Sequence, residues 1–573
     1  MLSEGFRCRG VEGFAVSMDS TMQPTPLLVS QILRFGTTLH ADQEVVTWTA
    51  DGPRRATYAE VGRQAAQLAH ALRGLGVEGD HRVATFMWNN AEHFVTYLAV
   101  PSMGAVLHAL NIRLFPEQIL YVANHGGAKV VIVDNTLAAA FAKLLPHLPQ
   151  VRHVVVNGPV DDDTCAALAG PAHVEAVHDW STLLEGQPTS YDWPEDLDEN
   201  SASSMCYTSG TTGNPKGVSY SHRSNYLHAV TTAMTADTRQ GDRLLVVVPL
   251  FHANAWGFPY LAMAVGASLV MPDRFLQAAP LATMIESEKV TYGAGVPTIW
   301  MDLLHHLEAN TVDVSTCRGL IVGGSAAPPA MMKSFKEQHG ITILHAWGMT
   351  EMSPIGTAAV PPAAVDEGSD AYWDYATSQG RLVLGVQGRL IGPDGGEVPW
   401  DGESVGELEV RGPWITGSYN AFGGESENEL AEMADKFHEG WLRTGDVGTL
   451  TPDGFLRLTD RAKDVIKSGG EWISSVDLEN AIMAHPDVLE ASVVGVPDER
   501  WGERPLATVV LREGAAATPM SLRDFLEDKL AHWQLPERWA LIDEVPKTSV
   551  GKFDKKVLRR RYAEGDLAVQ TLD

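Results

Sequence analysis

Short apolar runs alternate with longer amphipathic runs along most of this chain. The segment Arg82–Trp88 reads as a buried strand, Ala91–Val100 as a helix and Ala105–Leu110 as the next strand. Such alternation is typical of parallel β-sheets whose strands are connected by helices. We therefore expect an α/β protein with two such blocks, at roughly residues 50–200 and 205–360. The further apolar runs that support these blocks are Lys129–Val133, His153–Val156, Leu244–Val248, Ser268–Met271 and Gly319–Val322.

The pattern changes after residue 360. The turn-forming sequences GPDGG at 392–396 and PDG at 452–454 indicate a β-rich stretch over residues 380–460. Beyond this stretch, residues 466–573 are expected to form a separate α+β domain, with a helix, two strands and a helix at 475–484, 489–496, 506–511 and 520–530.

The length and charge of the chain limit its architecture and its partners. A single hydrophobic core stops growing near ~250–300 residues, so 573 residues require several domains or subdomains. Hydrophobic residues make up 45% and charged residues 20%, which excludes a disordered, collagenous or coiled-coil chain. The 43 Lys and Arg against 72 Asp and Glu give a net charge of −29, which repels nucleic acids and anionic membrane surfaces. We therefore expect no nucleic-acid partner, whereas small anionic ligands stay possible.

The sequence carries no signal for a membrane segment, an exported protein or a structural metal. Its four cysteines are scattered, without CxxC pairs or histidines at zinc-binding spacing, as in proteins of reducing compartments. The longest nearly uncharged apolar stretch, Tyr260–Met271, is much shorter than the ~20 residues that span a bilayer. The N-terminus lacks the apolar core of a signal peptide, and residues 1–22 read as a loose extension in which Met18 and Met22 could be start sites. A cytoplasmic protein without an integral membrane segment is expected.

The segment YTSGTTGNPKG at residues 207–217 carries the clearest chemical signal. Glycines let backbone N–H groups turn toward one point, and Ser and Thr hydroxyls add further donors, so such a loop can wrap a phosphate chain. The spacing is not that of a Walker A loop. A flexible surface loop would explain the glycines and hydroxyls but not the Pro215-Lys216-Gly217 end. Phosphate binding is therefore the favoured interpretation.

Together with further motifs, this loop resembles the adenylate-forming superfamily, which contains acyl-CoA synthetases, firefly luciferase and the adenylation domains of peptide synthetases. The match runs from about residue 30 to about residue 560, and within it the chain is most similar to bacterial medium- and long-chain fatty acyl-CoA synthetases. The resemblance implies an acid–thiol ligase that uses ATP, coenzyme A and Mg²⁺. The motifs are GGSAAP at 323–328, HAWGMTE at 345–351, LRTGD at 442–446, DRAKDVIKSGGEW at 460–472 and PKTSVGKFD at 546–554.

The resemblance also implies roles for single residues of the nucleotide site. Trp347 would stack on adenine, Thr350 would contact the α-phosphate, and Glu351 together with Thr208 would hold Mg²⁺, a cation that prefers carboxylate and phosphate oxygens. Asp446 would bind the ribose hydroxyls. The full nucleotide-binding set is Thr208, Ser209, Gly210, Thr211, Thr212, Gly213, Lys216, Gly323, Gly324, Ser325, His345, Ala346, Trp347, Gly348, Met349, Thr350, Asp446, Arg461, Lys463, Lys467, Trp472 and Lys552.

Lys552 stands where the family keeps its adenylation lysine. A lone lysine in a C-terminal loop is usually a solvated charge, but a carboxylate that attacks the α-phosphate brings two anions together, and Lys552 with Mg²⁺ would offset that charge. Residues 547–561 carry seven Lys and Arg against one Asp, a local reversal on an acidic chain that suits anionic substrates.

Domain rotation about a hinge is a further property that the resemblance implies. The expected organisation is an N-terminal domain at 23–459, made of two α/β subdomains and a β-rich subdomain, a hinge at 460–465 and a small mobile α+β lid at 466–573. In the family this rotation swaps the lysine out and turns a CoA-binding face in. The residues concerned are Asp460 and Lys463 in the hinge, and Gly469, Gly470 and Glu471 on the CoA face.

The segment PLFHANAW at residues 249–256 matches the family's acyl pocket. His252 would lie beside the reacting carboxylate, and Trp256 stands where a tryptophan gates the fatty-acyl tunnel of related enzymes. Each methylene contributes only ~0.8 kcal/mol of burial, so an apolar tunnel has few features that distinguish chain lengths. We expect a hydrophobic acid, either a medium- or long-chain fatty acid or a bulky apolar acid. The other expected wall residues are Val296, Gly324 and Gly348.

Departures from the family pattern keep alternatives open. Residues 419–440 form a long acidic segment before the LRTGD motif, Ala346 replaces a usual glycine, and residues 379–383 lack the usual Gly-x-Pro. A carboxylate-crowded nucleotide site could impair adenylation and leave mainly thioester formation from acyl-AMP. The other readings are a catalytically silent acyl- or nucleotide-binding protein, a luciferase-like oxidase, and a peptide-synthetase module, which is disfavoured because the chain stops soon after Lys552. A homodimer through the N-terminal domain is possible by the same resemblance.

Overall fold

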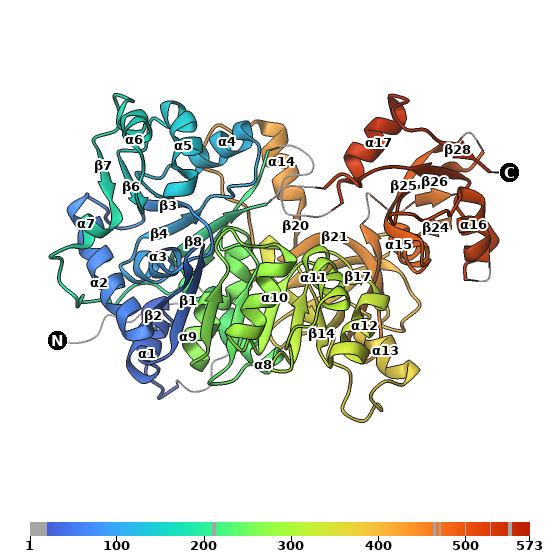
Figure 1. The fold of residues 1–573 in the computed structure, drawn as a ribbon, viewed down its shortest axis with the longest axis horizontal. Coiled ribbons are helices and arrows are strands. Elements are labelled where there is room, and N and C mark those ends of the chain that lie inside the picture. Colours follow the sequence, from blue (N-terminus) through green and yellow to red (C-terminus); the bar gives the residue numbers. More distant parts are fainter. Residues whose placement is uncertain are drawn as a thin grey trace.

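The computed structural model describes residues 20–208, 214–392, 394–461, 464, 466–468, 471–498, 500–527, 529–547 and 553–572. Within this part of the chain, two sheet-and-helix layers form the bulk of the molecule, and the C-terminal domain stands beside them (Figure 1). No helix of the described part is both long enough and apolar enough to cross a lipid bilayer.

The first sheet is buried on both faces. Alternate residues of one of its strands enter two separate cores, Val130 and Ile132 on one side and Val131 and Val133 on the other, because successive side chains of a strand point to opposite faces. Such strands read as continuous apolar runs, which is why the sequence identifies them. Across the sheet the strands are β7 (Ala176–Asp179), β6 (His153–Asn157), β5 (Val130–Asp134), β3 (Arg82–Phe86), β4 (Val106–Ala109), β8 (Ala202–Tyr207) and β9 (Gly217–Ser221).

Helices connect the parallel strands of this sheet. Their N-termini are capped in the expected way: Asn90 accepts a hydrogen bond from the amide of His93, and Asp161 accepts one from that of Thr164. The helices of this part and of the chain that precedes it are α1 (Val29–Leu39), α2 (Tyr58–Gly74), α3 (Ala91–Ser102), α4 (Pro116–Gly126), α5 (Asn135–Leu144), α6 (Asp162–Ala169) and α7 (Trp180–Leu184), with a 3₁₀ turn η1 (Leu145–His147).

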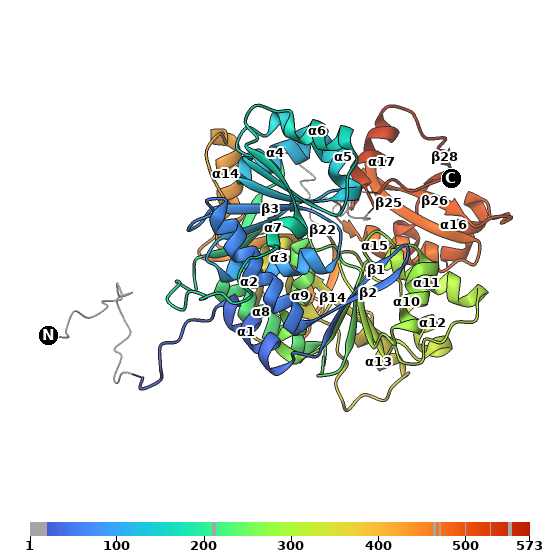
Figure 2. The same ribbon diagram turned by 60° about the vertical axis from the view of Figure 1, so that its left-hand side comes forward.

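The two blocks expected from the sequence exchange strands at their boundaries. Strands β1 (Glu44–Thr49) and β2 (Gly52–Thr57) join the second sheet, where β1 pairs in parallel with β11 (Ser268–Met271). Conversely, β8 and β9 complete the first sheet although they follow residue 200. The expected boundary near residue 200 is therefore wrong in detail. Figure 2 shows β1 and β2 beside the second layer. Local pattern identifies a strand, but the partner of a parallel strand is set by packing between distant segments.

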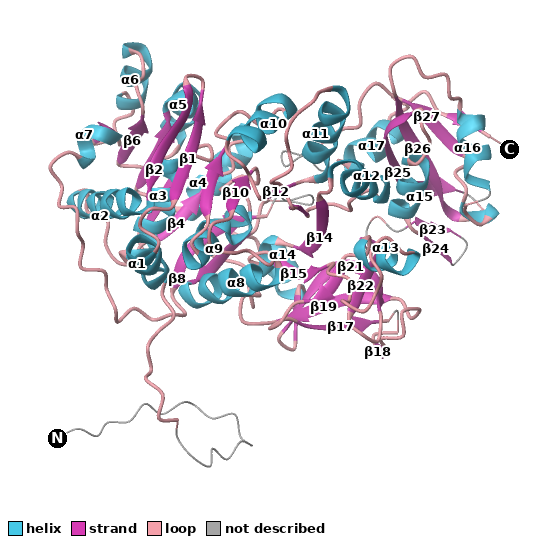
Figure 3. Cartoon of the chain, turned by 60° about the horizontal axis from the view of Figure 1, so that its bottom comes forward, coloured by secondary structure: helices cyan, strands magenta, loops and turns pink. Residues whose placement is uncertain are grey.

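Strand β14 (Thr342–Gly348) joins the second parallel sheet to the β-rich stretch. Its first half pairs in parallel with β13 (Gly319–Val322), and its second half pairs antiparallel with β15 (Ile355–Ala358). The β-rich stretch therefore continues the second sheet, and its strands gather together in Figure 3. The remaining strands are β10 (Arg243–Val246), β12 (Tyr292–Gly295), β16 (Gly380–Leu382), β17 (Gln387–Ile391), β18 (Glu397–Val398), β19 (Gly406–Arg411), β20 (Phe437–His438), β21 (Trp441–Leu450) and β22 (Phe455–Arg461).

Helices of this second layer pack against its parallel strands. Trp300 is fully buried there among apolar side chains of its neighbours. The helices between residues 222 and 435 are α8 (His222–Thr235), α9 (Phe258–Val265), α10 (Ala278–Ser287), α11 (Pro297–Ala309), α12 (Pro329–His339), α13 (Asp370–Ala376) and α14 (Glu427–Asp435), of which α14 contacts β20 instead, and the 3₁₀ turns are η2 (Ala253–Gly257) and η3 (Thr350–Met352).

The chain changes from the large sheet to a separate small sheet between β22 and β23 (Ile466–Ser468). This small sheet has its own core around the fully buried Trp539. The C-terminal domain is drawn in orange-red and red in Figure 1. Its other elements are β24 (Glu471–Ile473), α15 (Ser475–Met483), β25 (Val488–Asp498), β26 (Gly502–Leu511), α16 (Pro519–Glu527), η4 (His532–Gln534), β27 (Arg538–Leu541), α17 (Lys555–Ala563) and β28 (Gln570–Thr571).

Candidate active site

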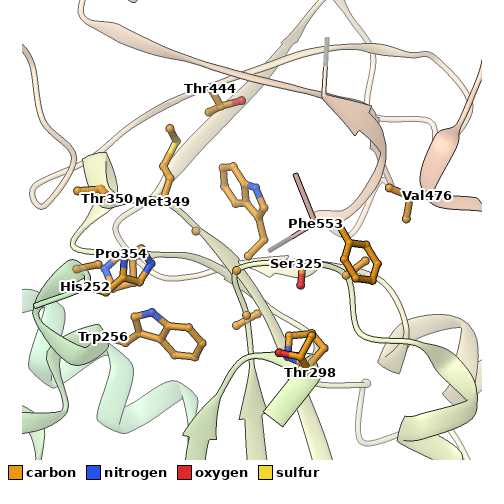
Figure 4. Close-up of a pocket in the computed structure, with 18 of the residues that line it drawn as sticks. His252, Trp256, Thr298, Ser325, Met349, Thr350, Pro354, Thr444, Val476 and Phe553 are labelled. Atoms are coloured by element: carbon orange, nitrogen blue, oxygen red, sulfur yellow. The ribbon is translucent and has the colours of Figure 1, made fainter. Parts of the chain in front are cut away.

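One cavity of about 950 Å³ brings together the motifs that the sequence singled out. It lies where the second sheet, its β-rich continuation and the C-terminal domain meet. In Figure 4, His252 and Trp256 lie on one side of the cavity, and Thr298 and Phe553 lie on the other. The predicted site residues that line it are Thr208, Lys216, His252, Trp256, Gly323, Gly324, Ser325, Ala346, Trp347, Gly348, Met349, Thr350 and Glu351.

The loop at residues 207–217, predicted to bind phosphate and called here the phosphate loop, is closed at its base by two hydrogen bonds. The Thr208 amide donates to the Lys216 carbonyl at 2.9 Å, and the Lys216 amide donates to the Thr208 hydroxyl at 3.0 Å. The Lys216 ammonium lies 5.4 Å from the ring centre of Tyr419. These contacts hold the two ends of the loop together at the rim of the cavity. Residues 209–213 lie outside the described part of the chain.

Trp347 is held in place by a buried hydrogen bond. Its indole N–H donates to Asp446 Oδ2 at 2.8 Å, and both residues are buried. Beside it, a Cβ on Gly348 would lie 1.9 Å from the Pro354 carbonyl oxygen, so only glycine fits at that position. A Cβ on Gly356 would likewise lie 2.5 Å from the indole ring. The strand β14 therefore presents a fixed aromatic face to the cavity.

Glu351 is buried and accepts a hydrogen bond of 2.5 Å from the Tyr419 hydroxyl. Burial, and then the neighbouring carboxylate, raise the pKa of Tyr419 above its ordinary value, so the phenol keeps its proton and acts as the donor. Thr208 and Glu351 offer a hydroxyl and a carboxylate, a set of hard oxygen donors that suits Mg²⁺. Among the described residues no group of three or more His, Cys, Asp or Glu could hold a metal ion, so further ligands would be water and substrate phosphate.

The opposite end of the cavity is apolar. Trp256 comes from the turn η2, and Phe258 follows it at the start of α9. Helix α8 contributes Thr232 and Thr235, and α11 contributes Met301. The cavity therefore joins a polar end that carries hydroxyl, ammonium and carboxylate groups to an end where the Trp256, Phe258 and Met301 side chains stand beside threonine hydroxyls.

The acidic segment 419–440 borders this cavity, but several of its carboxylates bond to neighbouring side chains. Glu425 accepts from His125 Nε2 at 2.7 Å, and Glu429 accepts from the Asn214 side chain at 3.1 Å. Of the whole segment, only Tyr419 and Lys436 line the cavity. No carboxylate of this segment lines the cavity itself, although Asp435 pairs with Arg443, which does. Whether these carboxylates weaken adenylation stays a prediction.

The basic residues of the C-terminal domain are paired with carboxylates at the cavity. Lys547 pairs with Glu490 at 2.6 Å, and Lys555 pairs with Glu479 at 2.9 Å. All four residues line the cavity. In this arrangement of the domains, the local excess of cations in residues 547–561 is partly neutralised by the same domain.

Not every predicted site residue lines the cavity. His345 is buried beneath it, where its Nε2 accepts from the Ala327 amide at 3.4 Å, and burial lowers its pKa to about 4. Val296 caps α11, and its neighbours Pro297 and Thr298 line the cavity instead. Asp446 does not line the cavity either, and it accepts the hydrogen bond from the Trp347 indole that is described above.

Several predicted residues lie outside the described part of the chain. They are Ser209, Gly210, Thr211, Thr212, Gly213, Lys463, Gly469, Gly470 and Lys552, together with the side chains of Asp460, Arg461, Lys467, Glu471 and Trp472. Their assigned roles stay predictions.

Several lining residues had no signal in the sequence, and three of them illustrate why. Tyr419 and Lys436 belong to a segment that reads as acidic, and Thr232 belongs to a helix without a recognisable motif. Their place depends on contacts between segments far apart in the chain, which no local spacing reveals.

Comparison with known proteins gives the family. The family model described as "AMP-binding enzyme" matches residues 37–420, and "AMP-binding enzyme C-terminal domain" matches residues 477–552. The chain belongs to the AMP-binding enzyme family. The fold expected from the sequence is confirmed, as is the reaction class of an AMP-forming acid–thiol ligase.

Individual relatives of this AMP-binding enzyme cover nearly the whole chain. It is 40% identical to a medium-chain-fatty-acid–CoA ligase of Ectopseudomonas oleovorans, over 96% of this chain and 98% of the relative. It is 39% identical to a 3-methylmercaptopropionyl-CoA ligase of Ruegeria lacuscaerulensis, over 95% and 98%. A solved anthranilate CoA ligase in complex with anthranoyl-AMP superposes with a TM-score of 0.83 at 26% identity, over 96% of this chain and all of that one.

Proposed function

We propose that this AMP-binding enzyme activates an apolar carboxylic acid, of the straight-chain fatty-acid type, and passes it to coenzyme A through an acyl-AMP intermediate. The observation that carries the proposal is the single cavity whose polar end contains Thr208, Trp347 and Glu351 and whose apolar end contains Trp256. Both halves of an acyl adenylate would be accommodated in it, with the reacting carboxylate beside His252.

The residues at the polar end suit the handling of a nucleotide. The face of Trp347 would stack on adenine, and the Thr208 and Thr350 hydroxyls would donate to phosphate oxygens. Thr208 and Glu351 would hold Mg²⁺, which offsets phosphate charge when bound. Lys552 would supply the remaining cation during attack of the carboxylate on the α-phosphate. The CoA thiol would then displace AMP after the C-terminal domain rotates about residues 460–465.

The apolar end supports a hydrophobic acid. Curated relatives are named for medium-chain fatty acids, long-chain fatty acids and 3-methylmercaptopropionate, all flexible linear acids. The described lining of this end provides no buried cation for a second carboxylate, so we expect monocarboxylic acids to be preferred.

ATP–pyrophosphate exchange across a panel of acids, followed by detection of the CoA thioester, tests the proposal. The panel should contain straight-chain acids from propanoate to hexadecanoate, 3-methylmercaptopropanoate and an aromatic acid. Exchange and thioester with an apolar linear acid are the expected result. Thioester formation from supplied acyl-AMP without exchange would instead show a ligase impaired in adenylation. Tight acid binding without either reaction would show a silent binding protein, and oxygen uptake would show a luciferase-like oxidase.

A cytoplasmic location and a homodimer through the N-terminal domain remain parts of the proposal. Sedimentation of the full-length protein tests the dimer, and fractionation of the source cells tests the location.

A further inference from the structure

Four consecutive residues with side chains adopt a left-handed backbone in the wall of the cavity. The φ angles are 44° at Ala253, 51° at Asn254, 49° at Ala255 and 55° at Trp256, and Gly257 follows at 77°. This conformation brings Cβ close to the following carbonyl oxygen, so non-glycine residues adopt it singly rather than in runs. Such a run persists only where neighbouring contacts hold it.

The side chain of Asn254 supplies these contacts. Its Nδ2 donates to the Ser204 hydroxyl at 2.8 Å, and its Oδ1 accepts from the Cys206 thiol at 2.9 Å. The Tyr97 hydroxyl, 3.1 Å from the same Oδ1, shares its single proton between Asn254 and the Leu250 carbonyl. Asn254 is only 1% exposed, and its three partners are fully buried. Burial raises the pKa of the Cys206 thiol to about 12, so the thiol stays protonated and remains a donor.

The turn decides where Trp256 stands. A left-handed backbone directs Cβ differently from a right-handed turn, so the indole would leave its position if the turn reversed. The indole lines the cavity beside His252 (Figure 4). It packs against Gly323, where an added Cβ would lie only 3.1 Å from the ring. The glycine therefore leaves room for the indole on one side, and the left-handed turn fixes it from the other.

The same contacts reach the phosphate loop. Ser204 and Cys206 lie on β8, which ends at Tyr207, one residue before Thr208. The wall of the apolar end is thus attached to the strand from which the polar end of the cavity begins.

We propose that Asn254 is a positioning residue for acyl recognition, which holds the left-handed turn and thereby fixes Trp256 as the wall that limits acyl length. This inference rests on the acyl pocket of the proposed function. An asparagine suits the task because it tolerates the left-handed region better than most residues and because its amide both donates and accepts.

Binding of a homologous series of acids tests this role without chemistry. Dissociation constants of straight-chain acids from propanoate to dodecanoate are measured by calorimetry in the presence of AMP, for the full-length wild-type protein and for Asn254→Gly. Glycine accepts the backbone angles but removes the side-chain contacts. In wild type, the next longer homologues should bind more weakly than the tightest-binding acid. We expect the ratio of their dissociation constants to fall by at least about fourfold in Asn254→Gly, which corresponds to the contribution of one buried methylene. A profile within about twofold of wild type at every chain length would overturn the inference.

Asn225→Ala is the matched control. Asn225 is a buried asparagine that donates to Ser203 and to the same Ser204 hydroxyl, at 2.9 and 3.1 Å. Like Asn254 it does not line the cavity, but it lies on α8, outside the left-handed turn. This change should lower the melting temperature and leave the chain-length profile within about twofold of wild type. An equal change of profile in both variants would show general loosening and would overturn the positioning role.

Two further variants keep the test decisive. Asn254→Asp retains an acceptor for Tyr97 and Cys206 and tolerates the left-handed region, so it should restore most of the discrimination. If Asn254→Gly does not fold, Cys206→Ala removes one donor from the same group and should change the profile in the same direction. An unchanged profile would then overturn the inference.

Absence of exchange with every acid would contradict the proposed function, while the comparison of acid binding between variants would still stand. A wild-type protein that binds no acid would overturn both.

Discussion

At the scale of single residues, polar contacts hold the reactive groups of the cavity in fixed positions. Glu351 is fixed by the Tyr419 hydroxyl, and Trp347 is fixed by Asp446. If Glu351 holds Mg²⁺ and Trp347 stacks on adenine, as proposed, such contacts orient both groups before the substrate arrives. Tyr419 is therefore expected to matter for the nucleotide although it belongs to no recognisable motif.

Tyr419→Phe should raise the KM for ATP by about tenfold, because a hydrogen bond to a charged group contributes about 1.5 kcal/mol. The ring that faces Lys216 would be kept. ATP–pyrophosphate exchange at varied ATP measures the change, and the KM for CoA should stay the same. Tyr191→Phe, which removes a hydroxyl that accepts from Arg73 far from the cavity, is the control. Equal KM values for ATP in wild type and Tyr419→Phe would contradict the role of the contact.

Lys552→Ala should abolish acyl-AMP formation while sparing thioester formation from supplied acyl-AMP. The physical reason is that loss of one preorganised charge costs ~10²–10³ in the rate of the step that it stabilises. Pulse experiments that follow the two half-reactions separately measure this difference. Equal loss in both half-reactions would rule out the assignment. Lys529→Ala, in the same domain but outside the lining of the cavity, should affect neither.

At the scale of elements, α14 shows how an acidic segment can border the cavity while several of its carboxylates bond to other side chains. Its capping box joins Ser426 and Glu429, and the preceding Glu425 accepts from His125. His125 also bonds the hydroxyl of Tyr207, directly before the phosphate loop, at 2.6 Å. The helix is thereby attached to the first sheet, and its C-terminal end directs Lys436 to the cavity.

Glu425→Ala should loosen the attachment of α14 to the first sheet. Glu425 also accepts from the amides of Phe422 and Gly423, so its removal leaves several donors without a partner. Faster hydrogen–deuterium exchange over residues 420–436 is the expected result. Glu427→Ala, two residues along in the first turn of α14, should leave exchange unchanged. Identical exchange in Glu425→Ala and wild type would show that the contact does not hold the helix.

At the scale of the whole molecule, the stability of the protein should depend on buried neutral histidines. Burial lowers the pKa of His93, His222 and His345 to about 4, and that of His108 and His228 to about 3. The unfolded chain binds protons at these groups near pH 6.5, whereas the folded protein does not until well below that. Their contribution to stability is therefore complete above pH 6.5 and is lost as the pH falls toward 4.

The free energy of unfolding should consequently fall between pH 6.5 and 4, by up to about 1.4 kcal/mol per pH unit for each histidine. Burial raises the pKa of Asp134 to about 7 and also raises that of Asp273, so these two carboxyl groups oppose the trend of the five histidines. Chemical denaturation across this range measures how steeply the free energy of unfolding falls with pH, which is the slope meant here. His108→Leu should make it shallower, because His108 faces Arg82 and His125 and neither of its ring nitrogens has a partner among the described residues. A slope unchanged by this substitution would contradict the prediction.

Sequence patterns located most strands and helices because burial on both faces of a parallel sheet leaves continuous apolar runs. They could not assign β1 and β8 to the correct sheets, because sheet pairing depends on distant partners. At the site, motif spacing identified Trp347, Thr350 and Glu351, all of which line the cavity. Motif spacing did not distinguish His345, which is buried beneath the cavity, from the residues that line it. Burial of a side chain is decided by what packs over it.

The sequence by itself determined the α/β class, the family and the type of reaction, since these depend on local residue types and their spacing. Only the tertiary structure decided where the carboxylates of the acidic segment bind, which tyrosine contacts Glu351, and that residues 253–256 form a left-handed turn whose Asn254 side chain bonds to the first sheet. The physical reason is that each of these depends on hydrogen bonds between segments widely separated in the chain. Such contacts form only when the packed sheets bring those segments within a few ångströms of one another.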